Sequence, residues 1–250
     1  MKIARAMLGN ETFYCILEGE SVKPITGKPF EQIVKDGREF ALKDVKLLCP
    51  SEPSKVVAVG LNYASHANEM KEDLHSDPVL FIKPGTSVLN PFEAIIYPRS
   101  SSRVDHEAEL AVVIGRTCKD VSEDLVHDYI FGYTCLNDVT ARDLQKKDGQ
   151  WTRAKGFDTF CPFGPHIETE YDWRNKRVRS ILNGETKQDS DTGCFMFSVE
   201  KLVSYISSVM TLLPGDVVST GTPQGIGPML RGDTIQIVVE GIGILENTVR

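Results

Sequence analysis

The sequence predicts an α+β fold in which strands dominate. Short apolar runs recur along the chain, separated by dense turn signals that draw on its 20 glycines and 13 prolines. Segments with helical periodicity are fewer, and they do not alternate with the strands as a βαβ layout would require. At 250 residues, the chain is long enough for one sizeable core and a small additional domain.

A small, β-rich N-terminal domain is expected over residues 1–50. It contains two strand-like runs, Ile3–Leu8 and Thr12–Leu17, separated by a short Gly-Asn-Glu turn. The following Pro-Ser-Glu-Pro-Ser stretch, residues 50–54, has the composition of a linker. The larger domain is therefore expected to span residues 54–250.

The larger domain is predicted to combine many strands with a few short helices. The clearest helix ends near Met210, because apolar residues recur before it at helical spacing. A short helix is expected after Asn62, whose side chain can cap it. The expected strands are 55–60, 79–83, 94–97, 106–114, 130–137, 216–220 and 234–239. The clearest helix is expected at 198–210, and two others at 122–129 and 141–147.

Composition argues against two classes of partner. The formal net charge of -7 disfavours nucleic acid and anionic membranes, and no basic run offsets it. No signal peptide or membrane span is readable at the N-terminus. The six cysteines form no Cys-x-x-Cys pair and are expected to be reduced. These features predict a cytoplasmic protein whose partner is a small molecule.

The stretch from residue 104 to residue 114 carries two carboxylates into an apolar strand. Successive strand residues point to opposite faces, so Glu107 and Glu109 share one face with Ala111 and Val113. Two buried like charges need a compensating cation, and hard divalent cations prefer carboxylate oxygens. The pair therefore indicates a metal site. With the register reversed, the same face would be solvated.

Asp138 follows an apolar run and is a candidate third carboxylate. It would complete a set of oxygen ligands that suits Mg²⁺ or Mn²⁺ and leaves positions open for water or substrate. The alternative is a structural role as the N-cap of the helix that follows.

Two further groups are candidates for catalysis. His66 and Glu69 are three residues apart, so on a helix they share a face and the carboxylate can orient the imidazole as a general base. The alternative is a surface pair on a polar helix. Lys155 lies among small and aromatic residues and can stabilise an enolate, or it can be a surface lysine. The Gly-rich turn around Thr222 either contacts a substrate carboxylate or is an inert turn.

The joint order of these motifs resembles the fumarylacetoacetate hydrolase family. The similarity extends over roughly residues 54–249, nearly all of the larger domain. It is carried by Val59–His66, Phe81–Pro84, Asp105–Gly115, Asn137–Asp143, Ala154–Asp158 and Thr220–Gly227.

The resemblance implies a mixed β-sheet roll, a small N-terminal domain and a homodimer. It implies that Mg²⁺ or Mn²⁺ is bound by Glu107, Glu109 and Asp138. It implies that His66 and Glu69 form a general-base dyad on a lid. It implies that Lys155 is itself a cation that faces the substrate near the metal. Residues that fall where members contact substrate are Arg142, Gln145 and Thr222.

The resemblance also implies an activity. The His-x-x-Glu spacing is similar to that of acylpyruvate hydrolases and oxaloacetate decarboxylases. The expected reaction is cleavage of a carbon–carbon bond in a small 2-oxo acid, by decarboxylation or hydrolysis, through a pyruvate enolate that the metal stabilises. The alternative is an isomerase or tautomerase of 2-hydroxy-2,4-dienedioates, like the hydroxyheptadienedioate isomerases of aromatic degradation. A non-catalytic homologue that binds a 2-oxo acid would be expected to have a broken ligand set, whereas here the set is complete.

Overall fold

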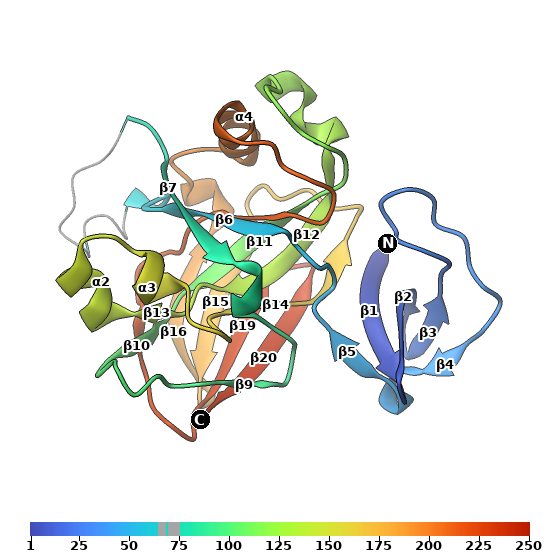
Figure 1. The fold of residues 1–250 in the computed structure, drawn as a ribbon, viewed down its shortest axis with the longest axis horizontal. Coiled ribbons are helices and arrows are strands. Elements are labelled where there is room, and N and C mark those ends of the chain that lie inside the picture. Colours follow the sequence, from blue (N-terminus) through green and yellow to red (C-terminus); the bar gives the residue numbers. More distant parts are fainter. Residues whose placement is uncertain (65–68, 70–75) are drawn as a thin grey trace.

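Strands dominate the structure, as the sequence predicts. It is a computed structural model that describes residues 1–64, 69 and 76–250. Figure 1 shows the first five strands grouped on one side of the molecule, with the other strands and the helices forming a larger body beside them. None of the helices described is both long and apolar enough to cross a bilayer.

The N-terminal strands form an antiparallel group around a small apolar core. The first two are the hairpin that the sequence predicts, with Ile3 opposite Ile16. The first strand also pairs with a strand of the larger body through Lys2 and Ile3, so one sheet runs through both parts. The strands are β1 (Lys2–Leu8), β2 (Glu11–Glu18), β3 (Ser21–Pro24), β4 (Phe40–Ala41) and β5 (Lys46–Leu48).

The sheet that runs through both parts is mixed and has 12 strands. Its central path is β4-β3-β2-β1-β14-β12-β11-β17-β6-β7, in which β17 and β6 are parallel and the other neighbours antiparallel. The strands of the larger body are β6 (Lys55–Gly60), β7 (Val79–Pro84), β8 (Val88–Leu89), β11 (Ala108–Ile114), β12 (Ile130–Asn137), β14 (Cys161–Glu168) and β17 (Val217–Ser219).

Two smaller sheets complete the larger body. One has the order β13-β10-β18 and the other β16-β15-β19-β20-β9. Their strands are β9 (Ala94–Ile95), β10 (Val104–His106), β13 (Thr140–Ala141), β15 (Arg177–Leu182), β16 (Glu185–Asp191), β18 (Gly227–Met229), β19 (Thr234–Val239) and β20 (Gly243–Val249). The described helices are α2 (Arg142–Asp148), α3 (Thr152–Lys155) and α4 (Val199–Val209), with 3₁₀ turns η1 (Leu42–Asp44), η2 (Gly85–Ser87), η3 (Glu123–Asp128) and η4 (Thr192–Cys194).

Several sequence predictions of local structure need correction. The helix expected at 122–129 is the 3₁₀ turn η3, and the strand expected at 94–97 ends at Ile95. The helix expected after Asn62 falls largely outside the described residues, and within them the Asn62 side chain bonds the backbone of Phe197 and Thr220. Strands β14, β15, β16 and β20 were not expected. Two of them lack the usual signal of a strand, since β14 contains two prolines and β16 consists of polar residues.

The core lies on both faces of β11. Leu110 and Val112 belong to the largest apolar cluster, whereas Ala111 and Val113 belong to a second cluster on the opposite face. All seven residues of β11 are buried. A strand covered on both faces is held rigidly, which suits an element that positions functional groups. The six cysteines are free thiols, as expected.

We expect His166 to make stability depend on pH. This residue of β14 is buried, and burial together with the charge of Lys2 lowers the pKa of its imidazole from 6.5 to about 4. In the unfolded chain the imidazole binds a proton below about pH 6.5, whereas in the folded protein it does so only below about pH 4. The free energy of unfolding should therefore fall by up to about 3 kcal/mol as pH drops from 6.5 towards 4.

Urea unfolding at pH 7 and pH 4.5 measures this effect. His166→Gln removes the titrating group and should reduce the pH dependence, while the exposed His127→Gln should keep it as in the wild type. An unchanged dependence in His166→Gln would assign the effect to other groups.

Candidate active site

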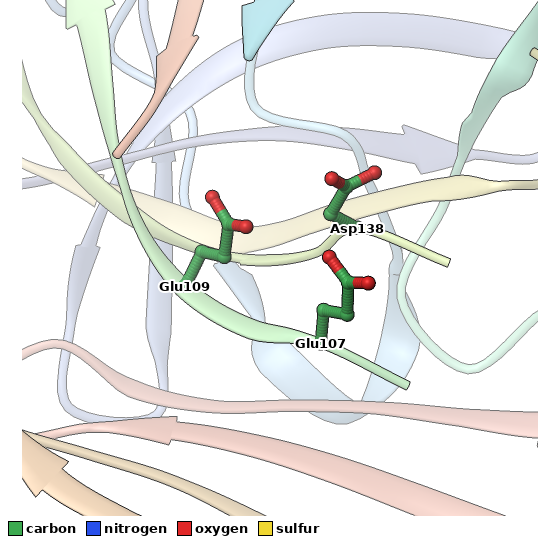
Figure 2. A group of neighbouring side chains, drawn as sticks. All are labelled: Glu107, Glu109 and Asp138. Atoms are coloured by element: carbon green, nitrogen blue, oxygen red, sulfur yellow. The ribbon is translucent and has the colours of Figure 1, made fainter. Parts of the chain in front are cut away.

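Three carboxylates converge in the larger body, as the sequence predicts. Glu107 lies in the break between β10 and β11, Glu109 lies on β11, and Asp138 directly follows β12. Each residue offers one oxygen atom, and these atoms lie within 4.8 Å of one another. Figure 2 shows the three side chains gathered beside the ends of these strands. All three residues are buried.

The antiparallel pairing of β11 with β12 brings Asp138 to the two glutamates. Ala108 is opposite Asn137, so the residue after Asn137 reaches the level of Glu107. The backbone N–H of Asp138 donates to the carbonyl of Glu107 at 2.9 Å. The proximity of the third carboxylate is thus a consequence of strand register.

Both alternatives for these acids are wrong. The solvated alternative is wrong because Glu107 and Glu109 are both buried, and every residue of β11 is buried as well. Asp138 does not cap the following helix, since the N-cap of α2 is Ala141 and no side chain caps that end.

Three buried cations surround two of the carboxylates. The Nζ atom of Lys155 donates to Glu107 Oε2 at 2.8 Å and to Asp138 Oδ2 at 2.6 Å. Lys83 donates to Asp138 Oδ1 at 2.5 Å, and Arg142 donates to Glu107 through Nη2. Because Lys155 is buried, its interpretation as a surface lysine is wrong. Burial alone would lower its pKa, but the charges of Asp138 and Glu107 raise it, so this lysine stays protonated.

Lys83 is a residue of the site to which the sequence assigned no role, although the Phe81–Pro84 motif contains it. It is fully buried on β7 and also donates to the carbonyl of Val139 at 3.1 Å. The one available signal was a lysine inside the apolar run that precedes Pro84. Such a residue is usually solvated at a strand end, and only the tertiary structure shows that it faces Asp138.

Glu109 differs from the other two carboxylates. Its Oε2 atom accepts hydrogen bonds from the Ser219 hydroxyl and from the Gly221 N–H, and in the described part of the chain it has no cation within hydrogen-bond distance. Burial and the charge of Asp138 raise the pKa of Glu109 to about 8. A divalent cation among the three oxygens would supply the missing positive charge, so the residues present fit a metal ion.

The carboxylates line a cavity of about 300 Å³. Arg142, Gln145 and Thr222, the three predicted substrate contacts, line the same cavity, as does Lys155. The structure therefore brings these predicted residues together in one place. Their roles toward a substrate stay predictions.

Arg142 is also engaged within the protein. Its three nitrogen atoms donate to Asp105, Gln145 and Glu107 through Nε, Nη1 and Nη2, respectively. The guanidinium is buried, and the charges of Glu107 and Asp105 raise its pKa against the effect of burial. Arg142 thus holds Glu107 in place from its position at the start of α2.

Thr222 is held by a residue that the sequence did not reveal. Its hydroxyl donates to the carbonyl of Ala108 at 2.9 Å and accepts from Gln188 Nε2 at 2.7 Å. Gln188 Oε1 in turn accepts from the N–H of Ala108 at 2.9 Å. The Gly-rich turn and the strand break beside Glu107 are therefore tied together by β16. No motif pointed to Gln188, because it lies in a polar strand.

Of the predicted dyad of His66 and Glu69, the structure describes only Glu69. His66 lies outside the described residues. Glu69 is exposed, and its Oε1 atom accepts a hydrogen bond from the N–H of Gly225 at 3.0 Å. Glu69 is thus placed against the Gly-rich turn that contains Thr222, near the cavity. The pairing of His66 with Glu69 stays a prediction.

The motif resemblance is confirmed by comparison with known families. The family described as fumarylacetoacetate (FAA) hydrolase C-terminal matches residues 55–250, most of the chain. The chain belongs to the fumarylacetoacetate hydrolase family. A second family, described as Rv2993c-like, N-terminal, matches residues 1–50.

Relatives of the chain include proteins from distant organisms. Protein Rv2993c of Mycobacterium tuberculosis is 46% identical, with 100% of this chain and 98% of the relative covered. The mitochondrial oxaloacetate tautomerase Fahd2a of Rattus norvegicus is 40% identical, with 82% of this chain and 69% of the relative covered.

Solved structures show the same fold over the whole chain. The 5-carboxymethyl-2-hydroxymuconate delta-isomerase of Mycobacterium smegmatis has a TM-score of 0.95 and 46% identity, with 100% of this chain and 99% of that chain covered. The maleylpyruvate hydrolase of Sphingobium sp. SYK-6, in complex with manganese(II) and pyruvate, has a TM-score of 0.82 and 29% identity, with 100% and 98% covered. The expected family fold is therefore confirmed.

Removal of the Glu109 charge should disrupt metal binding. Glu109→Gln keeps the side-chain volume but removes the carboxylate that no described cation contacts. We expect the dissociation constant for Mn²⁺ to rise roughly 100-fold or more, since even indirect ligand partners typically contribute 10- to 100-fold. Isothermal titration calorimetry measures this, with the exposed Glu170→Gln as the control. Wild-type affinity in Glu109→Gln would remove Glu109 from the ligand set.

Proposed function

We propose that the protein is a divalent-metal-dependent enzyme that cleaves a carbon–carbon bond in small 2-oxo acids, with oxaloacetate as the first candidate and acylpyruvates as the next. The observation that carries this proposal is the cavity in which three buried carboxylates meet the ammonium group of Lys155. The family consists of enzymes, and the complete set of acids and cations argues against a non-catalytic homologue. The maleylpyruvate hydrolase that was solved with manganese(II) and pyruvate supports the choice of cation and of substrate class.

The cation is proposed to bind to Glu107, Glu109 and Asp138. As Mg²⁺ or Mn²⁺, it would supply positive charge where an enolate of pyruvate develops. Lys155 adds a second positive charge at the same wall, and burial strengthens its electrostatic effect. Lys83 and Arg142 hold Asp138 and Glu107 in place, which keeps the site preorganised.

The chain's own residues would then direct the reaction. In decarboxylation, the bond between C3 and the distal carboxyl carbon breaks, CO₂ leaves, and the enolate takes up a proton at C3. In hydrolysis of an acylpyruvate, a water molecule must first attack the distal carbonyl. We assign activation of that water to His66, oriented by Glu69, and assign substrate contacts to Arg142, Gln145 and Thr222.

A second candidate is proton transfer at C3 without bond cleavage. The names of two relatives, an oxaloacetate tautomerase and a 5-carboxymethyl-2-hydroxymuconate delta-isomerase, favour it. Removal of a proton from C3 would give the enolate of the intact substrate instead of the pyruvate enolate, and the same cations would stabilise it. The two candidates differ only in whether a carbon–carbon bond to C3 breaks.

Oxaloacetate distinguishes the two candidates directly. We expect Mn²⁺-loaded protein to release pyruvate faster than free Mn²⁺ does, and EDTA to abolish the excess. Pyruvate is measured with a coupled dehydrogenase, and the enol form by its ultraviolet absorbance in the same samples. Accelerated loss of the enol without pyruvate release would replace bond cleavage with tautomerisation. If the protein neither releases pyruvate nor accelerates loss of the enol, oxaloacetate is excluded as the substrate.

The proposed role of His66 predicts a selective defect. His66→Ala should lower kcat for hydrolysis of an acylpyruvate by about 100-fold or more, because only that reaction needs an activated water. Decarboxylation of oxaloacetate should fall less. Initial rates on both substrates measure the difference, with His127→Ala as a control for loss of an exposed histidine. Equal losses in both reactions would assign His66 to proton transfer in general.

A further inference from the structure

Among the residues that the structure describes, three cationic side chains line the cavity, and two of them already have protein partners. Lys155 is bonded to Glu107 and Asp138, and Arg142 is bonded to acidic and amide groups through all three of its nitrogen atoms. Both side chains are buried. Their positive charges are therefore largely balanced by the protein's own acids and are poorly placed to neutralise a second carboxylate on a substrate.

The third cation, Lys146, is different. It lies on α2, four residues after Arg142, so the two side chains lie on one face of the helix. Arg142 is buried near the carboxylates, whereas Lys146 is exposed and lines the cavity where it meets solvent. Within the described residues, Lys146 has no hydrogen bond or ion pair. Its charge is therefore available to an anionic ligand.

The cavity has a suitable surface for the carbon chain between two acidic ends. Phe81 and Trp151 line it and pack edge to face, with ring centroids 5.2 Å apart. Methylene groups of a short ligand can lie against these rings while its ends reach polar groups. The carboxylates form a buried part of the cavity lining, and Lys146 belongs to its exposed part.

We propose that Lys146 recognises the distal carboxylate of the substrate and so gives the enzyme a preference for 2-oxo dicarboxylates over monocarboxylic 2-oxo acids of the same length. The proposal rests on the proposed function, since it takes the 2-oxo end to lie at the carboxylate wall. Lys146 is a specificity-determining residue in this account. The chemistry at C3 belongs to other groups.

Binding of two unreactive ligands tests the preference without relying on turnover. The Mn²⁺-loaded full-length protein is titrated calorimetrically with 2-oxoglutarate and with 2-oxopentanoate, which differ in the distal carboxylate. We expect the dicarboxylate to bind about fivefold more tightly, as befits a partly exposed ion pair. Lys146→Met should remove this difference by weakening only the dicarboxylate, and Lys146→Arg should retain it.

Lys147→Met is the matched control. Lys147 is the adjacent exposed lysine on α2 and is not among the described residues that line the cavity. The Lys147→Met variant should keep the wild-type preference. Methionine is a good helix former, so neither methionine variant should disturb α2. Equal affinity of the wild type for the two ligands, or a preference retained in Lys146→Met, would overturn the role of Lys146 alone. Binding of neither ligand would instead overturn the 2-oxo acid site, and the inference with it.

Discussion

Charge compensation among buried acids is the constraint on which the site depends. Glu107, Glu109 and Asp138 lie together out of water, and each would be costly to bury alone. Among the described residues, cations contact two of these acids, whereas the third, Glu109, has only neutral donors. That asymmetry leaves room for one more positive charge among the three oxygens. A divalent cation and an anionic substrate are the natural partners of such an arrangement.

The acids and the groups that would contact a ligand come from different elements of the fold. The acids are attached to β11 and to the end of β12, inside a sheet that is covered on both faces. The groups that would meet a ligand come from α2, α3 and the Gly-rich turn, which surround the cavity. Gln188 joins the two sets, because it bonds both Ala108 and Thr222. The backbone that carries the acids is thus fixed by sheet hydrogen bonds, while Arg142 and Lys155 bond the carboxylates from the cavity wall.

Local sequence patterns indicated much of the fold but not all of it. The first hairpin and strands such as β6 and β12 were predictable, since each is an apolar run bounded by turn residues. Strands β14 and β16 were not, because a proline-containing strand and a polar strand lack that signal. They form because neighbouring strands supply backbone partners, which is a property of the assembled sheet.

The sequence by itself determined the alternation that places Glu107 and Glu109 together, the candidate third acid Asp138, and the family. Tertiary structure decided that both faces of β11 are buried, that Lys155 is buried rather than exposed, and that Lys83 and Gln188 take part. It also showed Arg142 bonded to Asp105 and Glu107, and left Lys146 available at the solvent end of the cavity. The reason is physical: alternation along a strand is local, whereas burial and ion pairing depend on which distant segments come together. Lys155 and Glu107, which are 48 residues apart, meet only in the folded protein.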